Sequence, residues 1–209
     1  MAQKTDLAIS SEGYRLTVTT NGVTITSSDA AGAFYARETL KQLATVDGNG
    51  VRRLPLVEIE DAPRYRWRGV HFDDCRHFFG KETLLGVLDL MAEHKLNRLH
   101  WHLTDDQGWR LDVPGCPELV KYGAVRPESV RHGETEATNG QPYGAQCNNW
   151  SEYTWNEYDL AWKMWPRTCA LAEVLWTGEA RPGYADFRRR MAVHRARLIG
   201  RRVNCAPLE

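Results

Sequence analysis

The sequence has 209 residues, of which 42% are hydrophobic and 26% are charged, a composition typical of a globular protein that can bury a core. Its 27 basic and 27 acidic residues balance, so the charge gives no reason to expect nucleic acid or a membrane surface as a partner. The five cysteines form no CxxC pair, so neither a disulfide framework nor a metal site is expected.

The N-terminal segment MAQKTDLAIS lacks the apolar centre of a signal peptide. No uninterrupted apolar run reaches the roughly 18 residues that a membrane-spanning helix needs. On this sequence alone we expect a soluble protein that stays where it is made, which would be the cytoplasm.

Residues 1–66 show the patterns of a small α/β layer. The stretch 13–27 alternates polar and apolar residues around an Asn-Gly pair, which predicts a β-hairpin with a two-residue turn. Asp29 is placed to cap a helix over 30–45, and the extended piece LPLVEIEDAP follows. We expect this layer to pack beside the next unit as a structural element.

Residues 67–209 begin with a strand–helix–strand pattern. A strand over 69–72 leads into an amphipathic helix over 81–94, and a second strand follows over 98–103. This order is typical of a parallel sheet, in which chemistry gathers outside the carboxyl ends of the strands.

The remainder of the chain contains a long loop, a third strand and two helical regions. The loop covers 125–143, and a buried strand is expected from Gly144. A helix over 158–177 should break or restart near Pro166, and an amphipathic helix with a basic outer face should cover 184–199. We interpret that basic face as a solvated surface.

Polar residues follow each expected strand. They are Asp73, Asp74 and Arg76 after the first, Asp105, Asp106 and Trp109 after the second, and Trp150 and Glu152 after the third. His100 and His102 share one face of the second strand, and we interpret them as core histidines in preference to metal ligands.

Several long motifs carry a family resemblance. The runs RGVHFDDCRHF, LMAEHKLNRLHWHLTDDQGWRLDV, GAQCNNWSEY and WPRTCALAEVLW resemble glycoside hydrolase family 20, the β-N-acetylhexosaminidases. The run EGYRLTV and the segment LPLVEIEDAPRYRWRG are similar to the small α/β domain that precedes the (β/α)8 barrel of this family. The resemblance therefore implies a small α/β domain followed by a barrel-type catalytic domain.

The resemblance also implies a reaction and a ligand. Family members remove terminal β-linked N-acetylglucosamine or N-acetylgalactosamine with retention, and the 2-acetamido oxygen of the substrate is the nucleophile. A glutamate serves as general acid and base, and the aspartate before it orients the acetamido group. No cofactor is implied, and the expected partners are glycans that contain N-acetylhexosamine.

The site residues are carried over motif by motif. By resemblance, Arg76 holds the O3 and O4 hydroxyls of the sugar, Trp150 forms a wall of the pocket, and Glu152 accepts hydrogen bonds from O4 and O6. Asp105 corresponds to the aspartate that supports the general acid through a histidine. The further candidates beside it are Asp106, in a supporting role, and Trp109, as a sugar contact.

The sequence departs from the family at the catalytic pair. The family motif His-x-Gly-Gly-Asp-Glu is absent, and no Asp is followed by Glu anywhere in the chain. Tyr143 and Gly144 join two segments that are far apart in the family, which reads as a deletion across the middle of the barrel. Glu134 and Glu136 in the long loop resemble the missing motif only superficially. We interpret them as residues of a solvated loop in preference to a replacement for the missing acid.

Three readings of function stay open on the sequence: an enzyme with residual or rearranged activity, an inactive carbohydrate-binding remnant, and a structural fragment. The segment 67–209 is shorter than the ~200 residues that a closed barrel needs. We expect a partial barrel made of strands that resemble the first, second and eighth, which are neighbours in a closed barrel. Its two exposed edges predict homo-oligomerisation.

Overall fold

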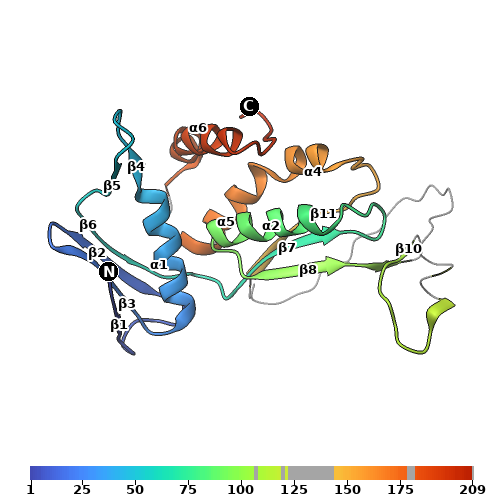
Figure 1. Ribbon diagram of the computed structural model, residues 1–209, viewed down its shortest axis with the longest axis horizontal. Helices are drawn as coiled ribbons and strands as arrows, with labels where there is room; N and C mark the ends of the chain where they lie inside the picture. The colour runs from blue at the N-terminus through green and yellow to red at the C-terminus, as the bar shows by residue number, and fades with distance from the viewer. Residues whose placement is uncertain (106–107, 119–120, 122–143, 178–181, 209) are drawn as a thin grey trace.

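The computed structural model describes residues 1–105, 108–118, 121, 144–177 and 182–208 (Figure 1). Two sheets organise this part of the chain, an N-terminal sheet of four strands and a sheet of three strands beside it. No helix within the described ranges has the length and apolar character that crossing a membrane requires.

The N-terminal sheet has the strand order β1-β3-β2-β6. Its strands are β1 (Ala2–Thr5), β2 (Tyr14–Thr19), β3 (Gly22–Ser27) and β6 (Val57–Asp61). The predicted hairpin is confirmed, but Thr19 pairs with Gly22, so Thr20 and Asn21 form the turn. Gly22, with φ of 138°, opens the next strand, because a residue without Cβ adopts that backbone conformation freely.

Helix α1 (Ala30–Leu43) packs on this sheet. The predicted cap is confirmed, since an Asp29 carboxylate oxygen accepts a hydrogen bond from the Gly32 N–H at 2.7 Å. Strand β1, which the sequence patterns did not predict, pairs in parallel with β3. The short strands β4 (Thr45–Val46) and β5 (Arg52–Arg53) form a separate antiparallel pair.

The second sheet is parallel and has the order β11-β7-β8. Its strands are β7 (Trp67–Asp73), β8 (Arg98–His102) and β11 (Gly144–Asn149). The strand from Gly144 therefore lies beside the strand of the RGVHFDD motif, as expected for neighbours in a barrel, although β11 is only partly buried. Gly144 is required there, because a Cβ atom would lie 1.9 Å from the Trp67 carbonyl oxygen.

Helices cover the face of this sheet that carries Val70 and Phe72 (Figure 1). They are α2 (Lys81–Glu93), α4 (Glu157–Met164), α5 (Arg167–Thr177) and α6 (Tyr184–Gly200). The predicted interruption at Pro166 is confirmed, since α4 ends before it and α5 begins after it. After β8 the chain forms a separate, small antiparallel pair of β9 (Thr104–Asp105) and β10 (Gly108–Trp109).

A buried arginine joins the two sheets. Arg68 on β7 is fully buried, and its guanidinium donates to Glu12 at 2.5 Å and to the carbonyl oxygens of Tyr65 at 2.7 Å and Lys95 at 2.8 Å. The same group lies against the rings of Tyr35 on α1 and Trp176 on α5. One side chain therefore links the N-terminal layer, β7 and the helical layer.

We expect Arg68→Ala to lower the free energy of unfolding by about 3–5 kcal/mol, because it leaves buried acceptors without a donor. Urea denaturation followed by circular dichroism measures the change. Arg66→Ala is the control, since Arg66 is exposed two residues away and should change stability by less than about 0.5 kcal/mol. Equal effects of the two substitutions would contradict the role of Arg68.

Candidate functional site

A polar cluster lies where the three parallel strands end. We call it the Arg76 cluster, and its members are Asp73, Arg76, His102, Asp105, Trp150 and Glu152. The sheet register explains the convergence, because Asp73 pairs with His102 and Phe72 pairs with Asn149, the residue before Trp150. The three parallel strands β7, β8 and β11 therefore finish side by side at the same edge of the sheet.

Arg76 lies at the centre of this cluster. Its Nη1 is 3.2 Å from an Asp73 carboxylate oxygen, and its Nη2 is 2.7 Å from Asp105 and 3.7 Å from Glu152. The guanidinium carbon lies 5.1 Å from the centre of the Trp150 ring. The Arg76 side chain is only 10% exposed, so this planar donor is held in a fixed orientation.

The charges of the cluster favour a neutral, hydroxyl-bearing ligand. Three carboxylates surround one guanidinium, and the excess negative charge disfavours an anionic ligand. Burial alone would lower the pKa of Arg76, but Asp73, Asp105 and Glu152 raise it. Carboxylates accept hydrogen bonds and the guanidinium donates them, so together they match the donor and acceptor character of hydroxyl groups.

Asp73 is fully buried and ionised. Burial alone would raise its pKa, but the N–H groups of Ser151 and Arg76, together with the Arg76 guanidinium, outweigh that effect and lower the pKa. The Ser151 N–H donates to Asp73 at 3.0 Å, which ties the segment after β11 to the end of β7. Asp73 therefore positions Arg76 and the segment that carries Glu152.

An aromatic floor adjoins the cluster. The ring centre of His71 lies 4.1 Å from that of Trp150, 4.6 Å from that of His100 and 5.3 Å from that of His102. Burial, with a contribution from His100, lowers the pKa of His71 to about 4, so the ring is neutral at physiological pH. Trp150 is 48% exposed, which leaves part of its indole available for stacking against a ligand.

Four of the residues predicted as site members come together, namely Arg76, Asp105, Trp150 and Glu152. Trp109 is placed in the β9–β10 hairpin, where its indole N–H donates to the Leu111 carbonyl oxygen at 2.5 Å. That bond is local and does not join Trp109 to Arg76. Asp106, Glu134, Glu136 and the long loop lie outside the described residues.

The prediction that His100 and His102 are core histidines is wrong. His100 is exposed and His102 is partly exposed, because the face of β8 that carries them is not covered by the helices. His102 belongs to the Arg76 cluster, with Nδ1 3.2 Å from Asp73 and Nε2 3.2 Å from Asp105. Its position at the end of β8 was the sequence signal that could have identified it, as for Asp73 at the end of β7.

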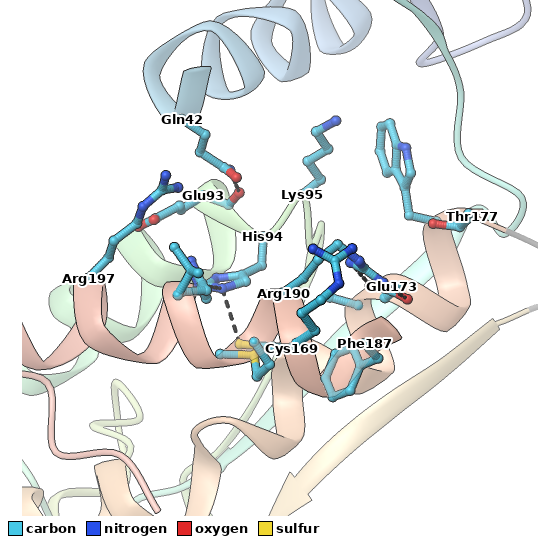
Figure 2. A pocket seen from close by; sticks show the side chains of 16 residues that line it. Gln42, Glu93, His94, Lys95, Cys169, Glu173, Thr177, Phe187, Arg190 and Arg197 are labelled. Atoms are coloured by element: carbon cyan, nitrogen blue, oxygen red, sulfur yellow. Dashed lines mark hydrogen bonds and ion pairs between the residues drawn. The ribbon is translucent and has the colours of Figure 1, made fainter. Parts of the chain in front are cut away.

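A second group of chemically active side chains lies on the helical side. The His94 Nε2 is 2.9 Å from the His194 Nε2 and 3.2 Å from the Cys169 Sγ, and all three residues line a pocket of about 650 Å³ (Figure 2). Burial lowers the pKa of His194 to about 4 and raises the pKa of the Cys169 thiol. These residues could hold a metal ion, and sequence spacing alone did not reveal them because they are far apart in the chain.

Comparison with known proteins places the chain in a family. The catalytic-domain profile of glycosyl hydrolase family 20 matches residues 65–138 and 128–179, and the profile of domain 2 of the same family matches residues 1–62. The chain belongs to glycoside hydrolase family 20. The expectation drawn from its motifs is thereby confirmed.

Relatives in this family share substantial identity over part of the chain. A Vibrio harveyi N,N'-diacetylchitobiase is 47% identical over 116 residues, which are 56% of this chain and 13% of that protein. A Cellulomonas fimi β-N-acetylhexosaminidase is 44% identical over 119 residues, which are 57% of this chain and 24% of that protein. The chain therefore spans between about an eighth and a quarter of the length of these two relatives.

Solved structures of the family share the fold. The Vibrio harveyi exo-β-N-acetylglucosaminidase in complex with N-acetylglucosamine aligns with a TM-score of 0.58 at 31% identity, over 63% of this chain and 22% of that one. A Streptomyces coelicolor β-N-acetylhexosaminidase aligns with a TM-score of 0.54 at 31% identity, over 82% of this chain and 32% of that one.

We expect Asp73→Asn to lower the free energy of unfolding by about 3 kcal/mol at neutral pH, because it removes a buried carboxylate from its donors. A folded-state pKa below the unfolded value of about 3.9 means that Asp73 stabilises the protein fully above that pH. The contribution falls as the pH drops through the lower folded-state pKa. Urea midpoints measured between neutral and acidic pH should therefore converge for the two proteins at low pH, and a difference that does not depend on pH would contradict this.

Proposed function

We propose that this chain binds the terminal N-acetylhexosamine of β-linked glycans, as the sugar-recognition part of a β-N-acetylhexosaminidase-type glycosidase. The observation that carries the proposal is the Arg76 cluster, in which one guanidinium lies beside an exposed indole and between three carboxylates. The names of the family relatives support the same class of substrate.

The chemistry of a pyranose fits these groups. One face of the sugar ring presents C–H groups that stack on an aromatic side chain, and the half-exposed Trp150 offers such a surface. Hydroxyl groups accept hydrogen bonds from Arg76 and donate them to Glu152 and Asp105. We assign O3 and O4 to Arg76, and O4 and O6 to Glu152, as the motif resemblance implies.

Recognition and hydrolysis are separate parts of this proposal. Retaining, substrate-assisted hydrolysis needs a carboxylic acid that protonates the leaving group, and the family's Asp-Glu pair is absent from this sequence. Asp73 cannot supply that proton at neutral pH, because its donors keep its pKa low. We therefore propose that this chain binds the sugar, and that the acid for hydrolysis comes from outside the Arg76 cluster.

Calorimetry with N-acetylglucosamine tests the recognition step. We expect Arg76→Lys, which keeps the charge but loses the planar fork, to weaken binding at least about tenfold, as loss of one charge-assisted hydrogen bond predicts. Trp150→Ala should also weaken binding, because it removes the stacking surface. Arg52→Lys is the control, since Arg52 is exposed on the remote strand β5.

Release of p-nitrophenol from p-nitrophenyl N-acetyl-β-D-glucosaminide tests the hydrolysis step. Binding without turnover is the expected result for the 209-residue chain. Turnover that survives Arg76→Lys would show that another site acts on the sugar. If the wild-type chain neither binds the sugar nor hydrolyses the glycoside, the proposal is wrong and a structural role is favoured.

We also propose that the chain self-associates through its parallel sheet. Within the described residues, β8 and β11 each have one neighbour in that sheet, so both present an edge with backbone groups that can pair with another strand. Sedimentation velocity over a range of protein concentrations should show a dimer or larger assembly. A monomer at every concentration would contradict this proposal without affecting the sugar-binding one.

A further inference from the structure

The second group of active side chains brings together three elements of the helical layer. His94 follows the end of α2, Cys169 lies in the first turn of α5, and His194 lies in the middle of α6. One ligand atom from each falls within 4.8 Å of the others. In Figure 2 the labelled side chains of His94 and Cys169 point toward one another across the pocket.

The hydrogen bonds of His94 fix its tautomer. Its Nδ1 is 2.7 Å from the Leu90 carbonyl oxygen, and a carbonyl oxygen only accepts, so Nδ1 carries the hydrogen. In the neutral ring, Nε2 is then an unprotonated nitrogen with a lone pair. A histidine that donates from one ring nitrogen to a backbone carbonyl and points the other at a ligand position has the arrangement typical of metal-binding histidines.

Two donors converge on this one lone pair. The His194 Nε2 lies 2.9 Å from the His94 Nε2, and the Cys169 thiol lies 3.2 Å from the same atom. A single lone pair accepts one well-aligned hydrogen bond, so only one of the two donors is fully satisfied. A cation placed between the three atoms would use all three as electron-pair donors.

We propose that His94, Cys169 and His194 form a zinc-binding site. Two imidazoles and one thiolate are ligands that zinc accepts in tetrahedral sites. Bond lengths of about 2.05 Å to nitrogen and 2.3 Å to sulfur give separations of about 3.4 Å between two nitrogens and about 3.6 Å between nitrogen and sulfur. The observed 2.9 Å and 3.2 Å are each within about half an ångström of these values. The third separation, between the Cys169 Sγ and the His194 Nε2, is at most 4.8 Å and would have to approach about 3.6 Å, so metal binding requires rotation of these side chains.

The fourth coordination position would face the pocket. The three ligands line it together, and water from the pocket can complete the tetrahedron. Binding releases the Cys169 proton, because a coordinating thiol is deprotonated by the metal, and His194 binds through Nε2 in the tautomer that carries its ring proton on Nδ1. Two of the arginines around the site are neutralised by glutamates, since Arg190 pairs with Glu173 at 2.6 Å and Arg201 pairs with Glu93.

This site is independent of the sugar-binding proposal. Helix α2 separates the two places, since it begins after the segment that carries Arg76 and ends just before His94. The zinc ion would connect α6 to α2 and α5. Its position, away from the ends of the strands, indicates a role in holding the helical layer together.

Titration of the metal-stripped chain with Co²⁺ tests the proposal. Cobalt bound by a thiolate gives a thiolate-to-metal charge-transfer band in the near ultraviolet, and we expect it to saturate at one equivalent and to vanish when Zn²⁺ is added. Cys169→Ala should abolish the band, and His194→Gln should weaken cobalt binding more than about tenfold. Zn²⁺ should raise the unfolding temperature of the wild type but not of Cys169→Ala.

Matched controls use residues of the same types elsewhere. Cys116→Ala and His100→Gln change an exposed thiol and an exposed imidazole, and both should keep the wild-type titration. If Cys169→Ala fails to fold, the partly exposed His194→Gln still tests the ligand assignment. Absence of the band in the wild type, or its loss in Cys116→Ala, would overturn the proposal.

Discussion

The buried guanidinium of Arg68 is the interaction on which the arrangement of the two layers depends. It is satisfied by Glu12 between β1 and β2, by the Tyr65 carbonyl ahead of β7 and by the Lys95 carbonyl after α2. A charge in this position is tolerated because the guanidinium donates to these acceptors and to the Tyr35 hydroxyl, and lies against two aromatic rings. Since Arg68 lies at the start of β7, fixing it also fixes the strand that carries Asp73 toward Arg76 at its other end.

Alternation along β7 assigns the two faces of the sheet to different tasks. Val70 and Phe72 point into the apolar core under the helices, and His71 and Asp73 point to the opposite face. One strand of seven residues therefore supports both the core and the polar site. If β11 shifted by one residue against β7, its side chains would change to the opposite face of the sheet. Only a glycine fits where Gly144 lies against Trp67, so this contact helps to fix the register of β11.

The two groups of active side chains differ in the way their charges are managed. Around Arg76 the carboxylates of Asp73, Asp105 and Glu152 lie within ion-pair distance of one guanidinium, an arrangement suited to a ligand rich in hydroxyl groups. Around His94 burial lowers the pKa of both imidazoles, which leaves ring-nitrogen lone pairs available to a metal ion, and it raises the pKa of the Cys169 thiol, which must lose its proton to bind one. Helix α2 separates the two environments, with the polar segment before its N-terminus and His94 at its C-terminus.

The sequence by itself determined the elements that depend on local chemistry. The hairpin of β2 and β3, the Asp29 cap, the break at Pro166 and the strand-end positions of Arg76, Trp150 and Glu152 all follow from neighbouring residues. Tertiary structure alone decided the roles of His71, His94 and Cys169, because their burial and partners arise from segments distant in the chain. Apolar periodicity predicts which face of a helix or strand a residue occupies, but it does not predict which side chains of a distant segment pack against that face.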